Sequence, residues 1–179
     1  MPIEYEAKVI EINPQEMEKK ILACGGEKLK AAKMRRYVYD LESNNQTRKW
    51  LRLRDTGTEV TLTVKEIRHD GIDGTEENEI MVPSFEDTHQ ILLKMNHTPK
   101  GYQENYRTSF VLENARLEID HWPQIPPYLE IEADSRELVI KTASKLGFTE
   151  ENLTGENTTK IYAHYGIDIH SITNLKFEE

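Results

Sequence analysis

The sequence is poor in cysteine and in long apolar runs. Cys24 is the single cysteine among 179 residues, which excludes an internal disulfide and a multi-cysteine zinc site. No apolar run approaches the roughly 20 residues that a membrane-spanning helix needs, so we expect no membrane partner. The first residues, Met1 to Glu4, have neither the basic nor the apolar region of a signal peptide. A cytoplasmic location is therefore the default expectation.

An excess of positive charge is also missing. The chain carries 23 Lys and Arg residues against 32 Asp and Glu residues, for a net charge of −9. Proteins that bind duplex nucleic acid usually show a basic balance or a basic stripe, so we expect no nucleic-acid partner. The acidic excess instead supplies carboxylates of the kind that hold hard divalent cations.

Internal repeats, low-complexity tracts and Pro/Ser-rich linkers are absent as well. One domain is the simplest organisation, and we place it at residues 1–169. Residues 170–179 have no clear periodicity, so we expect them to form a loosely attached tail.

The segments that are present read mainly as strands. Alternation of apolar and polar residues predicts strands at 3–12, 35–41, 50–54, 59–65, 77–82, 105–112, 116–120 and 128–133. Helices are expected after the N-cap residues Asn13, Ser84 and Ser135, and a last short one at 158–165. Strands that follow one another in sequence favour a mostly antiparallel sheet with helices packed on it, which is an α+β fold.

The charged residues share faces of these strands. Glu4, Glu6 and Lys8 alternate with apolar neighbours, as do Arg52 and Arg54. The same pattern recurs at Lys65, at Glu77 and Glu79, at Arg116, Glu118 and Asp120, and at Glu130 and Glu132. The ordinary interpretation is a charged face in water. The alternative is a sheet that curls into a barrel, so that the charged faces line a polar interior and the apolar faces pack outward against helices.

A polar interior of this composition suits phosphate chemistry. Arginine and lysine clamp phosphoryl oxygens, and carboxylates hold Mg²⁺ or Mn²⁺. Phosphoryl transfer needs mainly positioning and neutralisation of charge.

The order of these segments resembles a known family. Glu4-Tyr5-Glu6-Ala7-Lys8 is an E-x-E-x-K signature, and 50–54, 61–65, 77–79, Arg107, 117–120 and 128–132 follow in the order of the CYTH superfamily, the triphosphate tunnel metalloenzymes. The spacing of 119–126 before 128–132 looks most like the class IV adenylyl cyclase branch.

The resemblance implies a closed eight-stranded antiparallel β-barrel, with helices on its outside, that binds a triphosphate-containing small molecule. By position it implies catalytic roles for Glu4, Glu6 and Lys8, and phosphate binding by Lys8, Arg52, Arg54, Lys65, Arg107 and Lys160. It implies that two Mg²⁺ or Mn²⁺ ions are held by Glu4, Glu6, Glu79, Asp120, Glu130 and Glu132, with Glu77, Arg116 and Glu118 as further candidates. A homodimer is the family's habit.

Some positions stay open. The family often has K-x-R where this chain has Asn105-Tyr106-Arg107, and either Arg35 or Arg36 faces the lumen. Trp50 and Trp122 are expected outside the barrel or at its rim, and Cys24 is expected to be a small buried side chain.

Three functions are compatible with this reading. The first is a metal-dependent triphosphatase that hydrolyses tripolyphosphate or an organic triphosphate. The second is an adenylyl cyclase that converts ATP to cyclic AMP and pyrophosphate. The third is a polyphosphate-binding module without catalysis.

Overall fold

The computed structural model describes residues 3–41 and 48–178. Its strands are β1 (Ile3–Val9), β2 (Glu27–Asp40), β3 (Arg48–Asp55), β4 (Val60–Ile67), β5 (Thr75–Val82), β6 (Pro99–Leu112), β7 (Ala115–His121), β8 (Tyr128–Ala133) and β9 (Asn174–Leu175). Its α-helices are α1 (Pro14–Ala23), α2 (Phe85–Lys94), α3 (Arg136–Lys145) and α4 (Thr158–His164), with 3₁₀ turns at Glu150–Asn152 and Ile169–Ser171.

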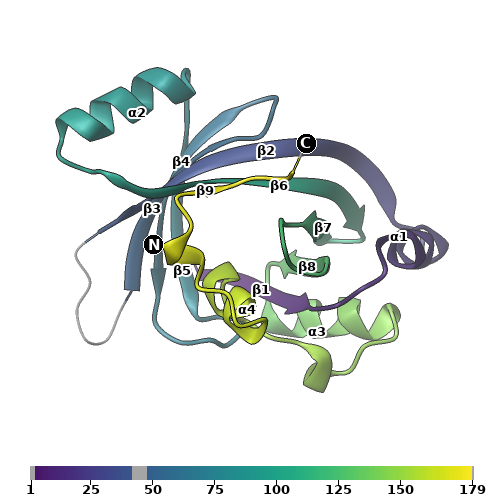
Figure 1. The fold of residues 1–179 in the computed structure, drawn as a ribbon. Coiled ribbons are helices and arrows are strands. Elements are labelled where there is room, and N and C mark those ends of the chain that lie inside the picture. Colours follow the sequence, from purple (N-terminus) through teal and green to yellow (C-terminus); the bar gives the residue numbers. More distant parts are fainter. Residues whose placement is uncertain (1–2, 42–47, 179) are drawn as a thin grey trace.

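The sheet closes on itself. Its order is β2-β3-β4-β5-β1-β8-β7-β6, and β6 pairs with β2 along both strands, so these eight strands form a closed antiparallel barrel. The ninth strand, β9, runs parallel to β6 at Tyr102 and Gln103. Figure 1 shows β2 and β6 as one long curved pair, with the helices outside the strands. The expected fold class is confirmed.

The helices start where side chains cap them. Asn13, Ser84, Ser135 and Asn157 each accept a hydrogen bond from the backbone N–H three residues later, which satisfies one of the free donors at a helix start. The expected helix starts are confirmed. Cys24 follows α1 as its C-cap and is exposed, so its expected burial is wrong.

The apolar strand faces point outward, under the helices. One cluster joins β1, β6, β7 and β8 to α1 and α3, with Ile131 and Val139 fully buried. A second joins β2 and β3 to α2, with Leu53 against Phe85 and Leu92. Hydrophobic packing therefore lies outside the barrel, and the opposite strand faces are left for polar side chains. No helix in the described ranges is both long and apolar enough to cross a membrane.

Two strands are longer than the sequence predicts. β2 begins at Glu27 and β6 at Pro99, because the two strands pair over almost their whole lengths. Residues 27–33 are mostly exposed and lack a buried face, so alternation gave no signal there.

The segment after residue 169, expected to be a loose tail, packs on the barrel. Leu175 in β9 is fully buried, and Phe177 lies against Tyr106 with ring centroids 4.8 Å apart. Ile169 and Leu175 share a cluster with Trp122, Ile161 and Tyr162.

Candidate functional site

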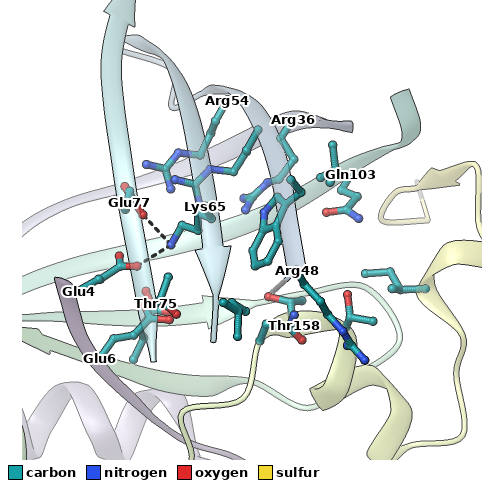
Figure 2. Close-up of a pocket in the computed structure, with 18 of the residues that line it drawn as sticks. Glu4, Glu6, Arg36, Arg48, Arg54, Lys65, Thr75, Glu77, Gln103 and Thr158 are labelled. Atoms are coloured by element: carbon teal, nitrogen blue, oxygen red, sulfur yellow. Dashed lines mark hydrogen bonds and ion pairs between the residues drawn. The ribbon is translucent and has the colours of Figure 1, made fainter. Parts of the chain in front are cut away.

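The barrel encloses a cavity of about 660 Å³. Thirteen of the residues predicted from the sequence line it: Glu4, Glu6, Lys8, Arg52, Arg54, Lys65, Glu77, Glu79, Arg107, Arg116, Glu118, Glu130 and Glu132. Figure 2 shows side chains from separate strands pointing into one space. The structure thus brings together the charged strand faces that alternation identified.

The charges are sorted around the barrel. Neighbouring strands β6, β2, β3 and β4 carry the basic wall, which we define as Arg107, Arg36, Arg52, Arg54 and Lys65. The remaining neighbours β5, β1, β8 and β7 carry the acidic wall, which we define as Glu77, Glu79, Glu4, Glu6, Glu130, Glu132 and Glu118. Lys8 on β1, Asp40 on β2 and Arg116 on β7 are the exceptions. A ligand in the cavity therefore meets positive charge on one side and negative charge on the other.

The basic wall holds more positive charge than its partners neutralise. Burial lowers the pKa of Arg36 well below its usual value, and Arg54 and Arg52 lower it further. Burial, followed by Arg52 and Arg107, lowers the pKa of Arg54 to about 9. The Nε atoms of Arg36, Arg52 and Arg54 are buried without a hydrogen-bond partner. Unpaired buried donors and repelling cations together favour the binding of an anion.

Arg36, and not Arg35, faces the cavity. Its guanidinium lies 4.6 Å from the centre of the Trp122 ring and donates a hydrogen bond to Asn105. Arg35 lies outside, where it pairs with Asp55 and Glu86. The choice that the sequence left open is thereby settled by strand register.

Lysines join the two walls. Lys65 Nζ lies 2.9 Å from Glu4 Oε2 and 2.7 Å from Glu77 Oε2, and Figure 2 shows it between them. Burial raises the pKa of Glu4 to about 8, although Lys65 opposes the shift. Because Lys65 is shared between two carboxylates, it does not fully compensate the burial of Glu4.

A second lysine neutralises the acidic wall further along. Lys8 Nζ lies 3.0 Å from Glu6 Oε1 and 3.3 Å from Glu130 Oε2. Burial opposes the charge on Lys8, but Glu6 and Glu130 raise its pKa above the usual value. Burial works against ionisation of Glu130 too, yet Lys8 and Arg107 hold its pKa well below the usual range.

Glu132 is the carboxylate with the least compensation. Burial raises its pKa, and Glu130 and Glu6 raise it further. Glu132 is the register partner of Glu6, so the two carboxylates share one region of the wall. Clustered carboxylates short of positive charge are a donor set that suits Mg²⁺ or Mn²⁺. In the described ranges no three His, Cys, Asp or Glu side chains already surround one point, because lysines stand between the carboxylates.

Asp120 occupies a different position. It is fully buried and lies behind the cavity surface, where Arg107 contacts both of its oxygens at 2.8 and 2.6 Å. Asn105 Nδ2 donates to the same carboxylate at 2.9 Å. Through these contacts Asp120 fixes Arg107 directly and Arg36 through Asn105. Its expected role in metal binding stays a prediction.

Lys160 does not reach the cavity. It lies in the first turn of α4, and its ammonium group pairs with Asp70 on the surface. The neighbouring Thr158 and Thr159 line the cavity instead, because this side of the short helix faces the barrel.

Sequence reasoning missed several lining residues. Trp50 and Trp122 were expected outside or at the rim, but both line the cavity, and Trp122 is 5% exposed. Trp50 stands two residues before Arg52, and Trp122 two residues after Asp120. Because side chains two residues apart in a strand point to the same face, this spacing could have placed both tryptophans on the lumen face. Arg48 stands two residues before Trp50 and could have been placed on the same face. His170 belongs to no strand pattern and could not have been found in this way.

The fold and the cavity define a class of protein: a tunnel barrel with a charged interior. The sequence matches the CYTH domain over residues 2–165, so the chain belongs to this family. No curated protein sequence matches the chain.

Solved structures share the fold. The chain is similar to the PH1012 protein of Pyrococcus horikoshii OT3, with a TM-score of 0.75, 21% identity, and coverage of 87% of this chain and 96% of that one. It is similar to a candidate adenylate cyclase of Vibrio parahaemolyticus, with a TM-score of 0.72, 14% identity, and coverage of 90% and 98%. It is also similar to HpAC1 of Hippeastrum, a candidate adenylyl cyclase described with a dominant triphosphatase activity, with a TM-score of 0.55, 15% identity, and coverage of 93% and 96%.

Proposed function

We propose that this protein is a metal-dependent triphosphatase. It binds a triphosphate in the cavity and hydrolyses a phosphoanhydride bond. The observation that carries the proposal is the separation of a basic wall from an acidic wall around one lumen. A chain of phosphates complexed with divalent cations has the matching arrangement of charge, with anionic oxygens toward one wall and cations toward the other.

The chain's own residues have defined tasks in this reaction. Arg36, Arg52 and Arg54 hold phosphoryl oxygens, since all three side chains line the cavity and arginine pairs well with phosphate. Carboxylates such as Glu6 and Glu132 would hold the metal ions, which would supply Lewis acidity for the reaction. Glu4, whose pKa burial raises to about 8, would accept a proton from the attacking water in its ionised form, which becomes the major form only above that pH. Water adds to the terminal phosphorus, the bond to the bridging oxygen breaks, and that oxygen leaves with the remaining phosphates.

The experiment is a product assay. The protein is incubated with tripolyphosphate or ATP, with Mg²⁺ or Mn²⁺, and phosphate, pyrophosphate and cyclic AMP are quantified. We expect phosphate release that is lost in Glu132→Gln and kept in the control Glu150→Gln, because Glu150 pairs with Arg136 and does not line the cavity. Absence of hydrolysis for every triphosphate and metal would reject the proposal.

An adenylyl cyclase is the second candidate. Trp50, Ile67 and Ile172 in the lining offer apolar contact to an organic group, and similar structures carry that description. In that reaction the 3′-hydroxyl of ATP attacks the α-phosphorus, and pyrophosphate leaves on the basic wall. Cyclic AMP and pyrophosphate from ATP would identify the cyclase, whereas ADP and phosphate identify the hydrolase.

A polyphosphate-binding module without catalysis is the third reading. Its signature is tight triphosphate binding without turnover under any metal. The acidic wall argues against it, because a protein that only binds polyanions gains nothing from carboxylates in its lumen. A homodimer and a cytoplasmic location stay predictions.

A further inference from the structure

One end of the cavity is built partly by residues that follow the CYTH match. Ile169, His170 and Ile172 line the cavity, whereas the family match ends at residue 165. We call the outer end the part of the lining formed by Arg48, Trp50, Lys100, His170 and Ile172. In the view of Figure 2, Arg48 and Thr158 lie on the opposite side of the pocket from Arg36 and Arg54.

The segment that closes this end is held in place by β6. The Tyr102 N–H donates to the Thr173 carbonyl at 2.9 Å, and β9 continues the pairing. Gly101 allows this close approach, because a Cβ there would lie 3.1 Å from the Ile172 carbonyl oxygen. The outer end is therefore a fixed part of the barrel.

The outer end brings together two basic side chains, Arg48 and Lys100. Arg48 has no carboxylate within ion-pair distance among the described residues, and Lys100 Nζ pairs with Asp40 at 2.6 Å. Burial lowers the pKa of His170, and the positive charges of Lys100 and Arg48 lower it further, against the opposing charge of Asp168. Among the described residues of the outer end, the guanidinium of Arg48 is thus the charged group without an ion pair.

The outer end also carries surface that inorganic phosphate cannot use. Trp50 lies on the same face of β3 as Arg48, and Ile67 is the register partner of Arg48 on β4. An indole and aliphatic side chains next to a cationic group suit a planar organic group that is neutral and rich in hydrogen-bond acceptors. A cavity of about 660 Å³ lies within the range of sites that hold whole small molecules, roughly 300–1,000 Å³.

We propose that the outer end binds the organic group of an organic triphosphate, and that Arg48 selects a neutral group, as in a nucleoside triphosphate, against a cationic group. This inference rests on the proposed function, because the basic wall must hold the phosphates for the organic group to reach the outer end. Thiamine triphosphate is the informative competitor, since its thiazolium ring is positively charged.

The test compares kcat/KM for ATP, thiamine triphosphate and tripolyphosphate with one metal at one pH. We expect the wild-type protein to prefer ATP to thiamine triphosphate by about tenfold or more. Arg48→Glu should lower this preference by about tenfold. Trp50→Ala should lower kcat/KM for ATP by about tenfold and change that for tripolyphosphate by less than about threefold. The control is Arg68→Glu, which makes the same charge change at an exposed residue paired with Glu76 outside the lining.

The outcomes separate the two proposals. Two results would overturn the role of Arg48 while the triphosphatase proposal stands. In the first, triphosphates are hydrolysed but Arg48→Glu leaves the preference for ATP unchanged. In the second, the wild-type protein prefers thiamine triphosphate. If nothing is hydrolysed, the triphosphatase proposal fails. The dissociation constants of the same three ligands are then measured by calorimetry, and their ratios test the role of Arg48 in place of the ratios of kcat/KM. Unfolding curves check that each variant is folded.

Discussion

Replacing Arg54 by glutamine is expected to stabilise the unliganded protein while it removes affinity for triphosphate. Arg54 lies in the basic wall, where burial, Arg52 and Arg107 lower its pKa from 12.5 to about 9. Since one pKa unit corresponds to about 1.4 kcal/mol, the upper bound on this penalty is about 5 kcal/mol. The variant also loses the contact of Arg54 with Glu79 at 3.6 Å. We therefore expect a net gain of about 1–2 kcal/mol.

The destabilisation caused by the charge on Arg54 depends on pH. The pKa of Arg54 is depressed in the folded state, so the penalty is fully present at pH 7 and falls only as the pH rises through about 9. Urea unfolding at pH 7 measures the free energy of unfolding of both proteins. Arg136→Gln is the matched control, because Arg136 is exposed and lies outside the cavity.

The same assay measures binding. Tripolyphosphate at about 100 times its dissociation constant should stabilise the wild type by about 2.7 kcal/mol. Arg54→Gln should lose most of this stabilisation. The reasoning is refuted if the unliganded variant is less stable than the wild type, or if tripolyphosphate stabilises both proteins equally.

Three further predictions follow from the site. Burial raises the pKa of Glu4 to about 8, so the folded state keeps a proton that the unfolded state releases near pH 4.5. The free energy of unfolding should therefore fall as the pH rises between these two values. Glu4→Gln should remove most of this fall, which urea unfolding at pH 5 and pH 8 measures. Asn105→Ala removes the bridge between Arg36 and Asp120 and should cost about 1–3 kcal/mol in the same measurement, whereas unchanged stability would contradict the bridge. Lys160→Ala removes an exposed ion pair outside the cavity and should change kcat/KM for tripolyphosphate less than about twofold in a phosphate-release assay; a large loss would show that Lys160 reaches the substrate.

The converging charged faces could be predicted because strand alternation is a local property. Glu4, Glu6 and Lys8 share a face whatever the strand pairs with, and the apolar residues between them must be buried on the other side. The direction in which the sheet curls is not local, and here the resemblance to a known family supplied it. The structure confirms the closed barrel and its outward apolar faces.

Other positions depended on contacts between distant segments. Arg35 and Arg36 could not be separated because apolar residues follow on both faces of β2, with Tyr37 on one face and Val38 on the other. Lys160 was placed by its position in a family pattern, but a surface carboxylate 90 residues away holds it. His170 joins the cavity through the pairing of β9 with β6, which brings Asn174 to Tyr102 and leaves no periodic signal in the sequence.

Because Lys65 is shared by Glu4 and Glu77, the binding of a cation and the binding of an anion in the barrel should depend on each other. A cation arriving at the carboxylates would release the ammonium group, which could then turn to an incoming anion, and an anion arriving first would free the carboxylates for the cation. Each ligand would thus strengthen the other's affinity by the same factor, as thermodynamic linkage requires. The triphosphate and its cations would thus each bind more tightly in the presence of the other than alone.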